Sequence, residues 1–202
     1  MKKIILISLL LVFGWLSAGA VDLNKDNRDP QYVESIVKRS QKIVDKLGLT
    51  DVKVAEDVRN VIANRYFELN DIYEVRDAKV KKIKESGLSG AAKDDALKAA
   101  EYEKDAALYR SHFAYPANLS LFLDEKQIEV VKDGMTYGVV KVTYDATIDM
   151  IPSLKEEEKA QIYAWLIEAR EFALDAENSD KKHAAFGKYL SLIHISEPTR
   201  PY

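Results

Sequence analysis

Apolar residues recur at intervals of three and four along most of the chain, which is the spacing of one helix face. The first such run follows Asp29-Pro30 and occupies positions 32, 33, 36, 37, 43, 44 and 47. Asp29 is expected to accept amide hydrogens of the first turn, and Pro30 fits the first helical position. Gly48 is expected to end this first helix.

A second apolar stripe, from Val54 to Ile83, covers about thirty residues and is expected to begin at a cap on Thr50 or Asp51. Two Ser-Gly pairs end it. A stretch rich in Ala, Lys, Glu and Asp then restarts the helix until Pro116 breaks or kinks it. The two segments are expected to pair as a long antiparallel helical hairpin.

Shorter elements are predicted after this hairpin. Asp124 and Gln127 have the spacing of a capping box, and the helix that they open is expected to stop at Gly134. Mixed β-branched residues follow, which favour an extended connector at 139–143 and a short helix at 144–150.

Pro152-Ser153 is expected to start the clearest helix in the chain, from Leu154 to about Asp175. Ser179 or Asp180 is then expected to cap a final helix. No pair of strands with a hairpin turn is visible in the sequence. The sequence therefore predicts an all-α fold, a single helical domain with a long hairpin and a C-terminal half of shorter helices.

The first residues have the form of a secretory signal peptide. Lys2 and Lys3 precede an apolar run that is too short for a membrane span, and Ala18-Gly19-Ala20 has the small-x-small form of a cleavage site. Cleavage is expected after Ala20, which makes residues 1–20 the leader and residues 21–28 a flexible polar arm. A periplasmic or secreted location follows, without stable membrane insertion after cleavage. The chain has no cysteine.

The formal net charge of −3 becomes −5 once the two leader lysines are removed. An acidic domain without a basic stripe is a poor partner for the phosphates of nucleic acid. Nucleic acid is therefore not expected as a partner.

The chain ends on "LSLIHISEPTRPY", residues 190–202, which continue no earlier pattern. Residues 190–200 match, letter for letter, the in-frame translation of a transposon adapter used in DNA sequencing libraries. Residues 190–202 are therefore interpreted as adapter-derived, and the helical domain is expected to span 29–189 and to be truncated at its C-terminal end.

Three predicted helices open with Leu followed by a polar, mostly acidic first turn, at Leu49, Leu123 and Leu154. These openings resemble the Leu-Thr-x-x-Gln motif of the periplasmic Spy and CpxP chaperones. None of the three has both the Thr and the Gln. Ordinary helix-start chemistry is the alternative explanation.

A broader resemblance covers nearly all of residues 29–189. It is carried by the stretches "KIVDKLGLTD", "LNDIYEVRDAKV", "VKDGMTYGVVKVTY", "EEEKAQIYAWLIEAREFALDA" and "KKHAAFGKY". Together they are similar to a family of small secreted proteins of Bacteroidetes known only as a domain of unknown function. The resemblance implies an exported helical domain, often from bacteria that degrade complex glycans, with no known activity. A link to polysaccharide use rests on that lifestyle alone.

Catalytic motifs are absent from the sequence: there is no nucleophile elbow, phosphate-binding loop or zinc-protease motif. Two histidines, His112 and His183, precede the tail and are too few for a zinc site. Asp180 lies one turn before His183, but a di-metal site needs more such pairs, so Asp180 is interpreted as a helix cap. The carboxylate pairs Asp145/Asp149 and Glu168/Glu171 are interpreted as surface charge. No catalytic residue, metal ion or cofactor is assigned.

The best candidate for a binding site is the C-terminal half, where aromatic and polar side chains mix as they do in ligand pockets. The candidate residues are Tyr137, Tyr144, Trp165, Arg170, His183, Lys188 and Tyr189. Gly134 and Gly138 would let backbones approach closely. Core positions for Trp165 and His183 are the alternative.

Three functions are compatible with these observations. The first is a non-catalytic exported domain that binds a small molecule, a glycan or a protein through its C-terminal half. The second is a periplasmic chaperone or stress sensor of the Spy type. The third is an enzyme that acts on glycans.

Overall fold

The computed structural model describes residues 20–196, and side chains from Ala20 to Tyr189. The predicted leader therefore lies outside the described residues, except for Ala20. Within the described range there are seven helices and no strand, so the predicted all-α class is confirmed. The helices are α1 (Pro30–Val44), α2 (Val52–Glu85), α3 (Gly90–Leu119), α4 (Glu125–Met135), α5 (Val139–Met150), α6 (Glu156–Leu174) and α7 (Ser179–Ser196).

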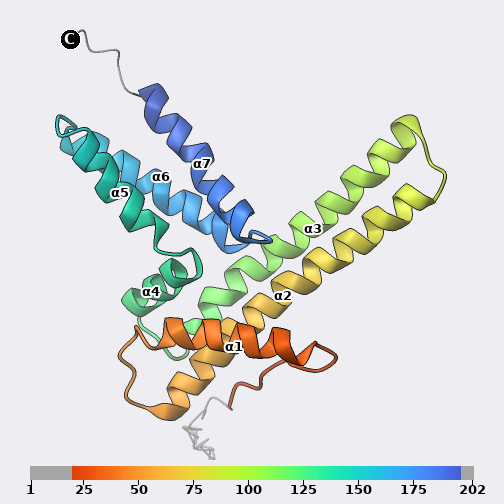
Figure 1. Ribbon diagram of the computed structural model, residues 1–202, viewed down its shortest axis with the longest axis horizontal. Helices are drawn as coiled ribbons and strands as arrows, with labels where there is room; N and C mark the ends of the chain where they lie inside the picture. The colour runs from red at the N-terminus through yellow and green to blue at the C-terminus, as the bar shows by residue number, and fades with distance from the viewer. Residues whose placement is uncertain (1–19, 197–202) are drawn as a thin grey trace, which may run out of the picture.

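The long helices α2 and α3 lie side by side and extend away from the other helices (Figure 1). Helix α1 packs across the start of α2, and α5, α6 and α7 form a separate group on the opposite side. Helix α4 contacts both α1 and α6, and so connects the two parts of the molecule. In the described range no helix is apolar enough over sufficient length to cross a membrane.

Two larger apolar cores follow from this arrangement, together with a small cluster of Ile36, Ala63 and Phe67 between α1 and α2. The first lies between α1, the first half of α2, the end of α3 and α4, and includes the fully buried Val58, Ile62 and Leu119. The second lies between α5, α6 and α7 around Leu166 and Phe186. The outer part of the α2–α3 pair has few buried residues and carries ion pairs such as Lys79–Glu103.

Helix starts follow the sequence closely. The Asp29 carboxylate accepts from the Tyr32 amide at 2.9 Å, and Asp51 accepts from the first-turn amides of α2. The Asp124–Gln127 capping box is present in full. The three similar openings at Leu49, Leu123 and Leu154 all lie at helix N-termini, where polar side chains meet unpaired amides.

Gly134 does not end α4, which continues through Met135. A Cβ atom at Gly134 would lie 3.0 Å from two carbon atoms of Ile43, so this glycine permits close contact between α4 and α1. The helix ends because Tyr137 and Gly138 both have a positive φ, of 62° and 67°. The stop prediction was wrong by one residue, because the glycine serves packing.

Residues 139–143 were predicted as extended, but they form the first half of α5. Their β-branched side chains disfavour helix only slightly, and burial of Val140 and Thr147 on one face outweighs that preference. Pro116 likewise lies inside α3, one turn before the helix ends at Leu119. The cap of α7 is Asn178, whose side chain accepts from the Lys181 amide at 3.0 Å, in place of Ser179 or Asp180.

The polar arm of residues 21–28 lies along α2. Arg28 donates two hydrogen bonds of 2.7 Å to the Asp71 carboxylate, and its guanidinium lies 4.6 Å from the centre of the Phe67 ring. Val21 packs against the first core. The arm predicted to be flexible therefore has specific partners on α2, which its polar composition does not reveal.

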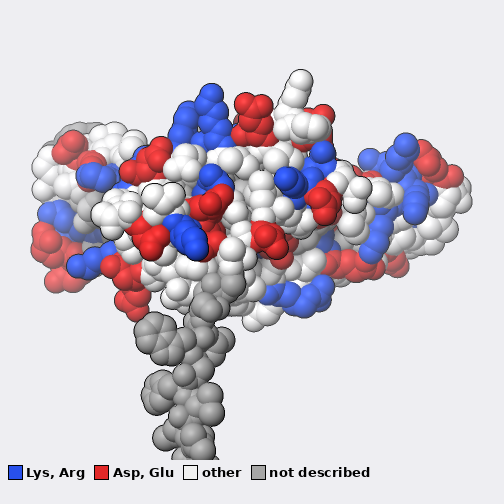
Figure 2. All heavy atoms as spheres, turned by 90° about the horizontal axis from the view of Figure 1, so that it is seen from below, with Lys and Arg blue, Asp and Glu red and all other residues white. Residues whose placement is uncertain are grey.

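Charged side chains of both signs are interspersed on the face shown in Figure 2. Many acidic and basic side chains lie three or four residues apart on one helix and form ion pairs, such as Lys159 with Glu156.

Candidate functional site

The structure gives the seven residues predicted as a site different surroundings. Trp165 and Tyr189 pack on the second core, and the Tyr144 ring meets Tyr163 edge-on at 5.3 Å between centroids. Burial, followed by a hydrogen bond with Glu168, raises the pKa of Tyr189. Lys188 is exposed on α7.

Arg170 is buried, with 2% of its surface exposed, and points toward α4. Its guanidinium donates to Asp133 at 2.8 Å and also to Glu129, and contacts Glu171 at 3.3 Å. Burial opposes the charge of Arg170, but the hydrogen bonds to Asp133 and Glu129 outweigh it and raise its pKa. These contacts join α6 to α4, so the geometry gives Arg170 a structural role.

Tyr137 and His183 do come together. Their rings are stacked with centroids 5.8 Å apart and planes 15° from parallel, and both side chains are exposed. Tyr137 has a φ of 62°, which a bulky side chain rarely adopts. The two sequence stretches around 133–138 and 182–189 therefore meet at one surface.

Lys182, the residue before His183 in the sequence, was not among the predicted site residues. Only 5% of its surface is exposed, and its ammonium donates to the Ala173 carbonyl at 3.1 Å. Burial lowers the pKa of Lys182 to about 8. Lys182 shares a helix face with Phe186 and Tyr189, and this spacing is the feature of the sequence that could have predicted its burial.

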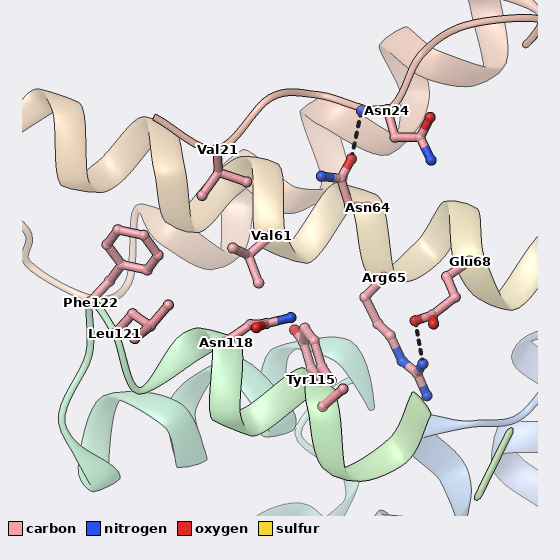
Figure 3. Close-up of a pocket in the computed structure, with 11 residues that line it drawn as sticks. Val21, Asn24, Val61, Asn64, Arg65, Glu68, Tyr115, Asn118, Leu121 and Phe122 are labelled. Carbon is pink, nitrogen blue, oxygen red and sulfur yellow. Dashed lines mark hydrogen bonds and ion pairs between the residues drawn. The ribbon is translucent and has the colours of Figure 1, made fainter. Parts of the chain in front are cut away.

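A groove of about 470 Å³ opens elsewhere, between the arm, α2 and the end of α3 (Figure 3). The arm supplies Val21 and Asn24, and the apolar surface comes mainly from Val61, Leu121 and Phe122. The remaining lining residues are Asn64, Arg65, Glu68, Ala114, Tyr115 and Asn118. Three stretches far apart in sequence therefore build this groove.

Arg65 and Glu68 stand at one end of the groove and are joined by an ion pair of 2.7 Å (Figure 3). Arg65 is 3% exposed, and it also donates to Ser111 at 2.8 Å and to the Asp175 carboxylate. Its positive charge is therefore met by two carboxylates. The signal for Arg65 in the sequence was a cation on the apolar stripe of α2, between Ile62 and Leu69.

Asp175 fixes the end of α6 against both long helices. Its second carboxylate oxygen lies 2.8 Å from Nδ1 of His112 on α3, and its carbonyl accepts from the Tyr73 hydroxyl at 2.8 Å. Sequence reasoning missed this group because its members are up to 110 residues apart. The group holds Arg65 in place at the end of the groove.

The side-chain amide of Asn118 has no hydrogen-bond partner among the described residues, and Figure 3 shows it between the two long helices. Asn64, by contrast, is used by the arm: it accepts from the Asn24 amide and donates to the Asp22 carbonyl. Two lining residues, Asn24 and Asn118, therefore have side-chain amides without a hydrogen-bond partner among the described residues. The rest of the lining is mainly an apolar surface with a neutralised ion pair at its end. This composition suits a neutral, hydroxyl-bearing ligand.

In the described range no group of three or more His, Asp or Glu side chains is arranged to hold a metal ion. A sequence search among curated proteins finds no match. A family model does match, over residues 33–194, which includes both long helices and nearly all of the C-terminal half. The chain therefore belongs to the family described as "Protein of unknown function (DUF3826)".

Proposed function

We propose that this protein is an exported, non-catalytic binding domain whose ligand occupies the groove between the arm, α2 and α3. The observation that carries the proposal is the groove itself. Its volume of about 470 Å³ lies within the range of small-molecule sites, roughly 300–1,000 Å³. Its lining combines the unused Asn118 amide with apolar side chains.

The charge of the lining favours a neutral ligand. Arg65 and Glu68 are the charged residues of the groove, and they pair with each other. A charged ligand would have to break that pair or remain uncompensated, and both are costly in a partly desolvated site. A mono- or disaccharide fits best, because it offers hydroxyl groups to Asn118 and an apolar ring face to Leu121 and Phe122. The resemblance implies no activity, and a link to glycan use rests only on the lifestyle of the bacteria that carry the family.

A second candidate site for the same function is the Tyr137–His183 stack. The observation that favours it is the positive φ of Tyr137, since strained residues concentrate at ligand sites. Stacked exposed rings would also suit the face of a sugar. This site keeps part of the predicted C-terminal set, whereas the groove contains none of it.

Thermal unfolding in a panel of neutral mono- and oligosaccharides tests the proposal. At a ligand concentration of about 100 Kd the stabilisation is roughly 2.7 kcal/mol, which raises Tm by several degrees. Replacing Asn118 by Ala should reduce the shift, whereas Asn70→Ala is the matched control because Asn70 is a surface amide of α2 bonded to Glu74 outside the groove.

Substitutions at Asn118 and Tyr137 separate the two sites. Trp165 is the one tryptophan after the leader, and it packs on the second core. A ligand in the groove should raise Tm and leave Trp165 emission unchanged, and Tyr137→Ala should have no effect on binding. A Tm shift that survives Asn118→Ala but is lost in Tyr137→Ala would move the site to the stack. No shift with any sugar of the panel would contradict the saccharide proposal.

A further inference from the structure

The backbone nitrogen of Val21 lies 2.7 Å from a carboxylate oxygen of Asp57 on α2. The contact is partly buried, and the Val21 side chain packs against the first core. Ala20, one residue earlier, is exposed. The chain therefore passes from solvent into contact with α2 at the Ala20–Val21 bond.

Three polar residues on one face of α2 hold the chain from this bond onward. After Asp57, Asn60 donates to the Val21 carbonyl at 2.8 Å. Asn64 donates to the Asp22 carbonyl at 2.8 Å and accepts from the Asn24 amide at 2.8 Å. Because residues 57, 60 and 64 have helical spacing, their side chains line up along one strip of α2. The first contact of this strip goes to the nitrogen of Val21.

A peptide nitrogen is a neutral donor, and a carboxylate forms a stronger, shorter bond with a charged donor. Hydrolysis of the Ala20–Val21 bond would supply that donor. Water adds across the bond, Ala20 leaves with a new carboxylate, and the nitrogen of Val21 becomes an α-ammonium. The position of Asp57 is therefore more favourable for the cleaved chain than for the intact one.

We propose that the Ala20–Val21 bond is the site at which an endopeptidase removes the leader, and that the new α-ammonium of Val21 forms an ion pair with Asp57. This ion pair fixes the first residue of the mature protein on α2. Since Val21 and Asn24 line the groove, the ion pair would anchor one of its walls more firmly. The proposal does not depend on which ligand the groove takes, and none of its tests needs a ligand.

Few other charges lie around this nitrogen. On α2, Arg59 donates to the side chain of Asn60 and pairs with Glu56. On the arm, Asp22 is adjacent in sequence. Across the groove, α3 contributes Ala114, Tyr115 and Asn118, which are uncharged at neutral pH. Asp57 is therefore the group expected to stabilise the ammonium most.

The first test is the N-terminal sequence of the product when the full chain is expressed in an exporting bacterium. We expect Val21 as its first residue. A product that begins at any other residue would overturn the proposal at once.

The second test measures the α-amino group directly, by trace labelling with acetic anhydride across a pH series. Only the neutral amine reacts, and a free amino terminus has an ordinary pKa of about 7.7–8.0. With Asp57 in place the pKa should be higher by about one pH unit or more, so labelling at neutral pH should be about tenfold slower than in Asp57→Asn. Asp22→Asn is the charge-matched control, and its labelling rate should be much closer to that of the wild type than to that of Asp57→Asn. Equal rates in the wild type and Asp57→Asn would refute the ion pair.

The third test compares chains that begin at Val21 with chains that begin at Ala20, each with and without the Asp57→Asn substitution. In the Ala20 chain the nitrogen of Val21 is again a neutral amide. Asp57→Asn should therefore lower Tm more in the Val21 chain than in the Ala20 chain. The same loss in both chains would mean that Asp57 holds only a neutral hydrogen bond, and the proposal would fail.

Discussion

The two parts of the molecule use polar and aromatic residues in different ways. In the α1–α3 part, polar residues of the arm and of α2 meet to build an open groove, and Arg65 is neutralised at its end. In the α5–α7 part, most of the aromatic residues that suggested a site lie in or against the second core. In the α5–α7 part, the aromatic residues of the sequence therefore mark a core. In the α1–α3 part, the groove results from contacts between segments that are far apart in the sequence.

The two buried arginines show the same contrast. Arg65 and Arg170 each have 2% of the side chain exposed, and each connects α6 to another part of the molecule. The partner of Arg65 across that junction, Asp175, is 19% exposed, whereas Asp133 and Glu129 beside Arg170 are 41% and 49% exposed. Removal of Arg65 would leave a less exposed carboxylate without its partner, so it should cost more stability than removal of Arg170.

The largest expected effect tests this difference. Removing one partner of a buried pair costs about 3–5 kcal/mol. We expect Arg65→Ala to lower the free energy of unfolding by an amount near the upper end of that range and Arg170→Ala by less, as measured by urea denaturation. The exposed Arg110→Ala on α3 is the control and should change it little. A larger loss at Arg170 would reverse the comparison.

The next effect concerns pH and lies in the C-terminal part. The pKa of Lys182 is lowered by burial from its ordinary value of 10.5 to about 8. The unfolded chain therefore binds more protons than the folded one between these values, so this group makes the protein more stable as pH rises through that window. Below about pH 8 Lys182 is charged in the folded protein, and burial of this charge lowers the free energy of unfolding.

Lys182→Met removes this penalty. At pH 7 the variant should be more stable than the wild type by up to about 3 kcal/mol, less the contribution of the lost bond to the Ala173 carbonyl. The difference should shrink as pH rises from about 8 toward 10.5. Chemical unfolding at several pH values checks both statements, and a difference that stays constant with pH would show that Lys182 does not titrate in this window.

Two glycine substitutions should change the free energy of unfolding by smaller amounts and in opposite directions. Gly134→Ala should lower the free energy of unfolding by about 1–3 kcal/mol, because the new methyl group would overlap the buried Ile43. Gly187→Ala in α7 meets nothing within 4 Å and should raise it by about 0.5–1 kcal/mol. Thermal unfolding of the two variants measures both signs. A stable Gly134→Ala variant would mean that α4 and α1 can separate easily.

The smallest effect is expected at Tyr137. Replacing it by Gly relieves a left-handed backbone cost of about 1–2 kcal/mol and loses a ring stack worth about 0.5–1.5 kcal/mol. The two nearly cancel, so the free energy of unfolding should change by less than about 1 kcal/mol. A much larger loss in calorimetry would show that Tyr137 supports the fold beyond its contact with His183.

Much of the local structure was predictable from the sequence. Asp29, Asp51 and Asp124 cap helices as expected, because a cap is a contact between residues two or three positions apart. The errors at Gly134 and at 139–143 have one cause. In both places contacts with α1 or α6 outweighed a local preference that the sequence alone displays.

The candidate sites were less predictable. Tyr137 and His183 were both selected, and the structure brings them together. Arg65, Lys182 and Asn118 were not selected, because a charged or amide side chain on a helix is usually a solvated one. Two of them lie on apolar faces, and that placement is the signal that such residues are buried.

The sequence by itself determined the all-α class and most of the helix starts, because spacing and caps act within a few residues. The tertiary structure decided where the groove lies and which cations are buried. The groove needs residues near 21, 61–68 and 114–122, and no local pattern reports that these three stretches meet. Only the packing of α2 against α3, and of the arm on α2, brings them within contact distance.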